Sequence, residues 1–238
     1  MRNTITPNLF IIGAPKSGTT TLHHWLSLHP EIFMTSHKEP AFFCGFSKKK
    51  WQGPGADIFA KGLVGDINTY EALFKGSERY KWRGEGSTDY LWVEEVPNQI
   101  VKHYGCENKK FLVILRDPTD RAFSEHSHLV RDELEDLDFI SAIKKEAERF
   151  EKKWQPLFYH VKRSLYSAPL ERYFSIFGRN HVKLILFDDL KENPKQVFRE
   201  ICMFLDIRKI TLPINSILNK SGRPRSQTIH KLIKKIQQ

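Results

Sequence analysis

Three short apolar runs recur along this chain, at residues 9–12 (LFII), 111–115 (FLVIL) and 182–187 (VKLILF). Runs that stay almost wholly apolar, rather than alternating with polar residues, are typical of strands covered on both faces of a parallel sheet. The pattern therefore predicts three buried parallel strands.

Stretches with apolar residues three and four positions apart follow these runs. They predict one helix that begins after the first run and ends near Pro30, and another that begins around Asp120. Further helices are expected at 138–150, at about 165–177, after Pro194, and at about 228–237. The segment 44–69, with several glycines and the run KKK, is expected to be a long surface loop.

Strands that alternate with helices predict an α/β fold, in which helices pack on both faces of a central, mainly parallel sheet. The chain has 238 residues and shows no repeat or low-complexity linker, so we expect a single domain spanning residues 1–238. Its composition, 40% hydrophobic and 28% charged, is that of a soluble globular protein.

The lack of a recognisable targeting signal and the cysteine usage together predict a cytoplasmic protein without a metal site. No window approaches the roughly 18 apolar residues of a membrane span, and the apolar run near the N-terminus is too short for a signal peptide. The three cysteines, Cys44, Cys106 and Cys202, are odd in number and widely spaced. This spacing argues against a disulfide framework or a zinc site and fits a reducing compartment.

The segment between the first strand and its helix reads GAPKSGTT, residues 13–20. A turn of this kind leaves backbone N–H groups unpaired at the positive end of the helix dipole, which favours an anion. The plain alternative is a strand–helix turn whose glycines serve geometry alone. A lysine, a serine and a run of threonines in one turn favour phosphate binding over that alternative.

The lysine of this loop is not where nucleotide hydrolases have it. Their pattern is G-x-x-x-x-G-K-[ST], in which the lysine contacts the terminal phosphates and the hydroxyl residue binds magnesium. Here the glycine spacing agrees, but Lys16 stands three positions earlier and Thr19 takes the lysine's place. A P-loop kinase that uses ATP is therefore kept only as an alternative function.

Two segments together resemble the sulfotransferases that use 3′-phosphoadenylyl sulfate (PAPS). PKSGTTTL, residues 15–22, is similar to the family's 5′-phosphosulfate loop, and FLVILRDPTDRAFSEH, residues 111–126, is similar to its 3′-phosphate segment. The resemblance implies a P-loop-like three-layer fold and a PAPS site with two anion-binding ends. The residues implied in donor binding are Lys16, Ser17, Gly18, Thr19 and Thr20 at the phosphosulfate, and Arg116 and Ser124 at the 3′-phosphate. On its own, Arg116 would read equally well as a strand-end arginine paired with Asp117 or Asp120.

HKEPAFF, residues 37–43, resembles the bacterial and glycan-type branch of the same family. In that branch the glutamate of this segment is the catalytic base, which implies this role for Glu39. A buried carboxylate beside the apolar residues that follow would also hold a proton more readily. Without the resemblance, Glu39 would read as an ordinary surface glutamate in a loop. His37 is kept as a lesser candidate for the base.

GEGSTDYL, residues 84–91, belongs to the same resemblance but departs from it at one position. Heparan-type members often carry a lysine after the glutamate of this segment, and here Gly86 follows Glu85. This departure weakens the case for a heparan-like acceptor.

The net charge of +10 is unevenly distributed, because no acidic residue follows Asp206. Residues 218–232 resemble the family's loop that closes over the 3′-phosphate and the adenine. The donor contacts implied there are Ser221, Gly222 and Arg223, with Arg225 as a second candidate. A non-enzymatic nucleic-acid binder that uses this basic tail is a further alternative. It lacks an aromatic stacking surface, so no nucleic-acid partner is expected.

The resemblance implies an enzyme that moves a sulfuryl group from PAPS to a hydroxyl or amine of a glycan, a lipid or a small molecule. Lys16 would stabilise the departing phosphate. No metal is expected, because a sulfuryl group carries less charge than a phosphoryl group. We expect the acceptor pocket in 44–69 and 150–165, where aromatic residues are interleaved with lysines. The same rings could equally anchor these segments to the core.

Overall fold

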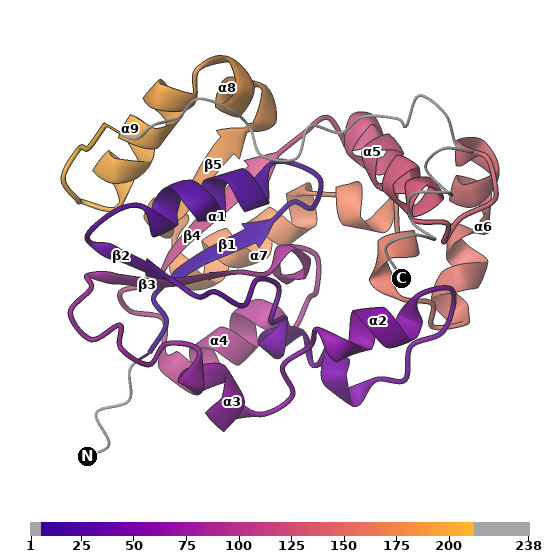
Figure 1. Ribbon diagram of the computed structural model, residues 1–238, viewed down its shortest axis with the longest axis horizontal. Coiled ribbons are helices and arrows are strands. Elements are labelled where there is room, and N and C mark those ends of the chain that lie inside the picture. The colour runs from indigo at the N-terminus through magenta and orange to yellow at the C-terminus, as the bar shows by residue number, and fades with distance from the viewer. Residues whose placement is uncertain (1–5, 212–238) are drawn as a thin grey trace, which may run out of the picture.

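The computed structural model describes residues 6–211. Its centre is one parallel sheet of five strands in the order β2-β3-β1-β4-β5, with β1 in the middle (Figure 1). The strands are β1 (Leu9–Gly13), β2 (Ile32–Met34), β3 (Trp82–Gly86), β4 (Lys110–Leu115) and β5 (Val182–Leu186). Because all of them run in one direction, their carboxyl ends meet at one edge of the sheet, where open α/β sheets bind ligands.

Helices connect the strands. They are α1 (Thr19–Ser27), α2 (Ala56–Lys61), α3 (Ile67–Ala72), α4 (Val96–Tyr104), α5 (Pro118–Arg131), α6 (Phe139–Glu151), α7 (Ser167–Phe177), α8 (Phe187–Glu192) and α9 (Pro194–Phe204). The start of α5 is locally encoded. The Asp117 carboxylate accepts the N–H groups of Thr119 and Asp120, both at 2.9 Å, and proline occupies the first helical position. The helix therefore begins almost directly at the end of β4.

Both faces of the sheet are apolar. In β1, Phe10 and Ile12 belong to the core on the side of α4 and α7, while Leu9 and Ile11 belong to the core on the side of α1 and α9. Side chains alternate across a strand, so a strand covered on both faces must be apolar at successive positions. The result is three layers, helix–sheet–helix, which confirms the predicted fold class (Figure 1).

Most of the predicted elements are present. The three apolar runs form β1, β4 and β5, and the predicted helices correspond to α1, α5, α6, α7 and α9. The third strand is one residue shorter than expected, because Phe187 already begins α8. The helix expected at about 228–237 lies outside the described residues.

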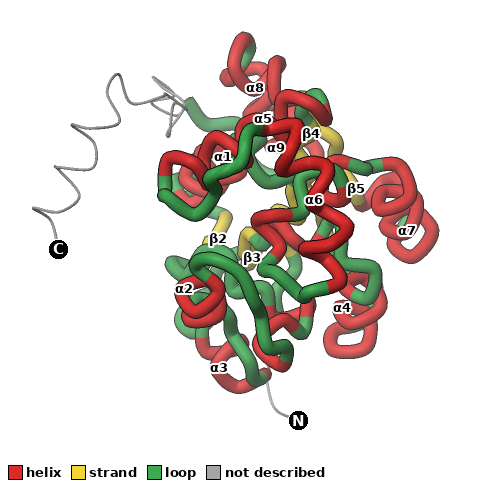
Figure 2. The backbone as a smooth tube through the Cα atoms, turned by 90° about the vertical axis from the view of Figure 1, so that its right-hand side faces the viewer, coloured by secondary structure: helices red, strands yellow, loops and turns green. Residues whose placement is uncertain are grey.

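Two expectations need correction. The segment 44–69 is not simply a loop, since it contains α2 and the first residues of α3. Two strands were also not predicted, β2 and β3, because β2 has only three residues and β3 reads WRGEG, a sequence without a continuous apolar run. Figure 2 views the molecule from the side of α5 and α6, which lie in front of the strands.

Candidate active site

Two glycines shape the loop that follows β1. Gly13 has φ 147°, and a β-carbon there would lie 3.0 Å from both the Thr88 carbonyl oxygen and the Leu91 β-carbon. Gly18 has φ 87°, and a β-carbon there would lie 2.9 Å from the Leu190 side chain. Both backbone conformations favour glycine, and neither site has room for a side chain. The glycines therefore hold the loop close to residues 88–91 on one side and to α8 on the other.

The loop presents unpaired backbone donors at the start of α1. Gly18 is the N-cap of this helix and no side chain caps it. Among the described residues, no acceptor receives the N–H groups of residues 16–20. These groups and the helix dipole favour an anion at this point. Ser17 and Thr19 are buried beneath the loop, and Thr20 is partly exposed.

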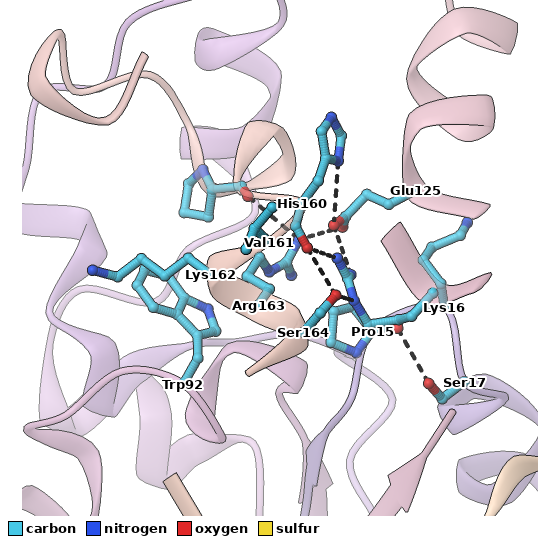
Figure 3. Close-up of polar contacts among 12 residues, drawn as sticks. Pro15, Lys16, Ser17, Trp92, Glu125, His160, Val161, Lys162, Arg163 and Ser164 are labelled. Carbon is cyan, nitrogen blue, oxygen red and sulfur yellow. Dashed lines mark hydrogen bonds and ion pairs between the residues drawn. The ribbon is translucent and has the colours of Figure 1, made fainter. Parts of the chain in front are cut away.

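Lys16 provides a cation in the same loop. Its backbone has φ 62°, its side chain is half-buried, and within residues 6–211 its ammonium makes no hydrogen bond or ion pair. Burial lowers the pKa of Lys16 to about 8, an effect that the nearby Glu125 carboxylate partly opposes. Figure 3 shows Lys16 at the loop with Glu125 beside it. A half-buried ammonium without a described partner is well suited to an anionic ligand.

Arg116 joins the second predicted anion segment to this loop. Its Nη1 donates to the backbone carbonyl of Lys16 at 3.2 Å, across 100 positions of sequence. The guanidinium lies 4.9 Å from the centre of the Phe187 ring, and its Nε is buried without a partner among the described residues. Asp120 is 3.9 Å away and largely exposed, so the alternative pairing exists only as a long, weak contact.

Ser124 lies on α5 beyond Arg116. Residues four apart share a helix face, so Asp120, which Arg116 approaches, and Ser124 point the same way. Ser124 is 9% exposed, and its hydroxyl has no hydrogen-bond partner in the part of the chain that the structure describes. The hydroxyl oxygen is not among the buried polar atoms that lack a partner, so solvent reaches it. It is available to a ligand that reaches this face of α5.

Glu39 lies on a turn held by three consecutive residues, Gly86 at the end of β3 and the two residues that follow it. Its carboxylate accepts the Thr88 N–H at 2.7 Å and the Thr88 hydroxyl at 3.0 Å, and it pairs with the Lys38 ammonium at 2.6 Å. The side chain is 39% exposed, so the expectation of a buried carboxylate is wrong. The polar contacts to Lys38 and Thr88 keep it at the surface of the site instead of among the phenylalanines.

Thr88 brings Glu39 close to the loop of residues 13–20. Its N–H and hydroxyl bond Glu39, while its carbonyl oxygen packs against Gly13 at the start of the loop. Glu39 and the loop are therefore separated by the span of a single residue. His37, the lesser candidate, has its Nε2 2.9 Å from the Gly62 carbonyl oxygen, at the end of α2, so one ring nitrogen is already bonded.

His23, on α1, is a residue that sequence reasoning missed. Its ring lies 3.4 Å from the position that a β-carbon on Gly86 would take, and its Nε2 is buried without a described partner. Burial and then the charge of Lys38 lower its pKa to about 4, so the ring is neutral near pH 7. The imidazole lies against the backbone at Gly86, the position where the resemblance would place a lysine. His23 could have been singled out from the sequence, because it lies on the helix that follows the loop at 13–18.

Four ionised side chains form a buried charge cluster next to the loop: Asp89, Arg121, Glu125 and Arg163. Arg121 pairs with Glu125 at 2.7 Å, and Arg163 pairs with Asp89 at 2.9 Å and also with Glu125. Although burial alone would raise it, the two guanidinium groups hold the pKa of Glu125 well below its usual range. Figure 3 shows Arg163 and Glu125 bonded, near Lys16. Arg163 is thus buried, so this cation of the segment 150–165 does not line an exposed acceptor surface.

The two segments expected to form the acceptor pocket lie side by side. The Gln52 N–H donates to the Lys153 carbonyl at 2.9 Å, and the Gln155 N–H donates to the Gln52 carbonyl at 3.0 Å. Their aromatic rings mostly pack on one another, as Trp51 does on Phe46 at 5.0 Å between ring centres. The lysines of both segments are exposed: Lys48, Lys49, Lys50, Lys61, Lys152, Lys153 and Lys162.

Some predicted donor contacts lie outside the described residues, namely Ser221, Gly222, Arg223 and Arg225. Within residues 6–211, no helix is both long and apolar enough to cross a membrane. The same part of the chain contains no group of three or more histidine, cysteine or acidic side chains arranged to share a metal ion.

Known proteins resemble this chain over most of its length. The crystal structure of a sulfotransferase from Alicyclobacillus acidocaldarius is 34% identical, with a TM-score of 0.82, and the match covers 98% of this chain and 91% of that one. The membrane-associated sulfotransferase kil1 of Dictyostelium discoideum is 23% identical over 86% of this chain and 57% of its own length. Mouse heparan sulfate glucosamine 3-O-sulfotransferase 5 is 27% identical over 84% of this chain and 54% of its own length. The chain spans about half the length of the curated relatives it matches.

Family profiles cover both predicted anion segments. A profile described as sulfotransferase family matches residues 7–61, which include the loop at 13–20 and Glu39. A profile described as sulfotransferase domain matches residues 91–229, more than half of the chain, which include Arg116 and Ser124. With the parallel sheet and the solved structure that shares it, these matches establish that the chain belongs to the sulfotransferase family.

Proposed function

We propose that this chain transfers a sulfuryl group from PAPS to a hydroxyl or amine of its acceptor, with Glu39 as general base and Lys16 on the leaving phosphate. One observation carries the proposal: the Arg116 guanidinium donates to the Lys16 carbonyl at 3.2 Å. This contact brings Arg116 beside the loop of residues 13–20, and within residues 6–211 the Lys16 ammonium has no hydrogen-bond or ion-pair partner. Such an arrangement suits a ligand with two separate anionic groups.

The available donors match the two ends of PAPS. The N–H groups of residues 16–20, with Lys16 and the Thr19 and Thr20 hydroxyls, would hold the phosphosulfate. Arg116 and Ser124 would hold the 3′-phosphate, for which the planar guanidinium is well suited. The tail residues Ser221, Gly222, Arg223 and Arg225 are proposed to add to the second group.

When bound, PAPS supplies the sulfuryl group and keeps the bridging oxygen on its departing nucleotide, adenosine 3′,5′-bisphosphate (PAP). Glu39 takes the proton of the acceptor hydroxyl, and Thr88 and Lys38 orient its carboxylate. Lys16 and the loop N–H groups face the phosphate on which negative charge develops. Fixed donors aimed at developing charge are a large term in catalysis.

Calorimetric titration tests the proposal against the kinase alternative. We expect PAP to bind more tightly than ATP with magnesium, because the site offers separate donors for a 3′-phosphate. Tighter binding of ATP with magnesium would overturn the assignment. A charge-assisted contact contributes about 1.5–3 kcal/mol, so 5′-AMP, which lacks the 3′-phosphate, should bind about tenfold or more weakly than PAP.

The control for this titration compares two arginines that both stack on phenylalanine rings. Arg116→Gln should remove most of the preference for PAP over 5′-AMP. Arg179→Gln should leave it unchanged, because Arg179 is exposed and lies 4.2 Å from the centre of the Phe174 ring, away from the loop. If the wild type and both variants preferred PAP over 5′-AMP equally, the 3′-phosphate would bind away from Arg116.

We further propose that the acceptor is a hydroxylated molecule, sugar-containing or lipid-linked ahead of a simple phenol. The support is the surface where 44–69 meets 150–165. There the Lys162 ammonium lies 4.1 Å from the centre of the Phe150 ring, and Lys49 lies 5.5 Å from that of Phe46. Rings that carry cations suit sugar or aryl rings with anionic substituents. A cytoplasmic location also stays a prediction, since kil1 carries the description membrane-associated.

Neutralising the lysines at 48–50 should change which acceptors are used without changing donor binding. The triple substitution to alanine removes exposed charges from the proposed acceptor surface. The residues proposed to bind PAP lie elsewhere, in the loop at 13–20 and at the end of β4. PAP affinity and transfer to a panel of glycan, lipid and phenol acceptors measure the two effects separately. The control is Lys75→Ala with Lys102→Ala, two exposed lysines on the side of α3 and α4. An acceptor profile identical to that of the control would exclude 48–50 from the acceptor site.

A further inference from the structure

The turn that carries Glu39 has an unfavourable backbone. Glu39 has φ 61° and Ala41 has φ 48°, so two residues other than glycine adopt the left-handed conformation within three positions. Such residues persist only where surrounding contacts hold them. The turn, residues 39–41, must therefore be fixed from outside.

Residues 86–88 supply those contacts in sequence order. The Glu39 N–H donates to the Gly86 carbonyl at 2.9 Å, the Ala41 N–H donates to the Ser87 hydroxyl oxygen at 3.0 Å, and Thr88 bonds the Glu39 carboxylate. The middle contact is the only one of the three in which the turn bonds a side chain through its backbone. It depends on the orientation of one hydroxyl.

Glu85 sets the orientation of that hydroxyl. The Ser87 hydroxyl donates its single proton to Glu85 Oε2 at 2.8 Å, which leaves its lone pairs for the Ala41 N–H. Tyr70 donates to the other oxygen of Glu85 at 3.2 Å. The chain of bonds thus runs from Glu85 through Ser87 to the backbone of the turn.

Glu85 is an unusual residue for a merely structural position. It is fully buried, at 0% exposure, and no cation pairs with it among the described residues. Burial raises the pKa of Glu85 to about 7. A buried carboxyl group without a cation is costly compared with an apolar side chain of similar size. The cost of burying the Glu85 carboxyl group suggests that its hydrogen bonds have a purpose, and one of them leads through Ser87 to the turn.

We propose that Glu85 is a positioning residue for the reaction: through the Ser87 hydroxyl it fixes the 39–41 turn, and so the direction from which the Glu39 carboxylate meets the acceptor. This inference rests on the proposed function, in which Glu39 is the base. Glu85 itself touches neither donor nor acceptor. Its effect should appear in the rate of the chemical step and not in donor binding, because within residues 6–211 no hydrogen bond joins the loop at 13–20 to the 39–41 turn.

Ser87→Ala is the main test, because it breaks the chain of bonds with little change in volume. A small misplacement of a reacting group can lower kcat by about tenfold to 100-fold, and we expect a loss of this size with PAP affinity unchanged. Ser77→Ala is the matched control: Ser77 is equally buried, and its hydroxyl donates to the Phe74 carbonyl at 2.6 Å, away from the site. It should leave kcat unchanged.

Two substitutions at Glu85 separate positioning from packing. Glu85→Gln keeps an oxygen that can accept from Ser87 and should retain most of kcat. Glu85→Leu fills the position without an acceptor and should lower kcat as Ser87→Ala does. Thermal denaturation of each variant reports folding, and if Glu85→Leu does not fold, Ser87→Ala and Glu85→Gln carry the test. A loss in Glu85→Gln equal to that in Ser87→Ala would contradict the mechanism.

Combination with Glu39→Gln distinguishes failure of this inference from failure of the proposed function. If Glu39 is the base, Glu39→Gln alone should lower kcat by about 100-fold or more, and adding Ser87→Ala should lower it no further. Normal turnover in Glu39→Gln would reject Glu39 as base and with it the proposed mechanism. Loss in Glu39→Gln with a Ser87→Ala variant that behaves like Ser77→Ala would reject only the role of Glu85.

Discussion

Lys16→Ala is expected to lower kcat about 100- to 1,000-fold, the cost of removing one preorganised donor from a site of developing charge. Lys16 is the half-buried cation of the loop, and within residues 6–211 no protein group pairs with its ammonium. PAP should still bind, more weakly, because the N–H groups of residues 16–20 and Arg116 remain. Single-turnover transfer and calorimetry with PAP measure the two effects. Unchanged turnover would refute the assignment of Lys16 to the leaving phosphate.

Lys109→Ala provides the control for Lys16→Ala. Lys109 is also buried, its pKa is also lowered by burial, and its ammonium donates to the Glu107 carbonyl at 3.0 Å. It precedes β4 and so lies at the amino ends of the strands, opposite the loop. Its removal should leave kcat unchanged. A similar loss in both variants would mean that the effect on kcat comes from folding.

The lowered pKa of Lys16 adds a pH signature to the same experiment. As pH rises through about 8, the free ammonium loses its proton and with it the charge that attracts phosphate. Above that pH, binding of PAP must take up a proton, so PAP affinity should fall between pH 7 and pH 9.5, a range that brackets this pKa. The Lys16→Ala variant should lack this dependence. A fall of equal steepness in the variant would assign the titration to another group.

Arg163→Met is expected to reduce the free energy of unfolding by about 3–5 kcal/mol, the usual cost of breaking a buried ion pair by removing one partner. Arg163 is 3% exposed and pairs with Asp89 at 2.9 Å and with Glu125. Without it, Asp89 loses its pairing with Arg163, and Glu125 keeps Arg121 and the 3.9 Å contact with His160, while both carboxylates stay buried. Urea denaturation measures the change.

Arg79→Met is the control for Arg163→Met. Arg79 is exposed, and its guanidinium lies 5.0 Å from the centre of the neighbouring Tyr80 ring. Surface substitutions of this kind usually change stability by about 0.5 kcal/mol or less. If Arg163→Met cost no more than Arg79→Met, the buried charge cluster would not contribute to stability in the way its geometry indicates.

Local patterns predicted much of the donor side of the site. Lys16, Thr19 and Thr20 lie in one loop. Arg116 lies at the end of one strand, and Ser124 lies on the helix that follows. Each group can therefore be recognised from a segment of fewer than ten residues. The contact between the Arg116 guanidinium and the Lys16 carbonyl agrees with the pairing of these segments that the resemblance implied. Their roles in binding PAPS stay proposals.

The surroundings of Glu39 could not be predicted in the same way. Glu39 was expected to be buried by the aromatic residues next to it in sequence, yet Thr88, 49 positions away, and Lys38 hold it partly exposed. The chain from Glu85 through Ser87 to Ala41 spans a similar separation. These contacts form only when the segment that follows β2 lies beside the end of β3, and β3 was itself missed because its sequence has no apolar run.

The sequence by itself determined the three apolar strands, the main helices, the α/β class and the position of the strand–helix turn at residues 13–18, because each follows from neighbours a few positions apart. Only the tertiary structure decided the strand order β2-β3-β1-β4-β5, the support of Glu39 by residues 86–88 and the burial of Arg163. These features depend on which distant segments share the interior, and hydrophobic burial has no direction. Hydrogen bonds and ion pairs that form between residues 38 to 49 positions apart then select one arrangement among those that burial allows.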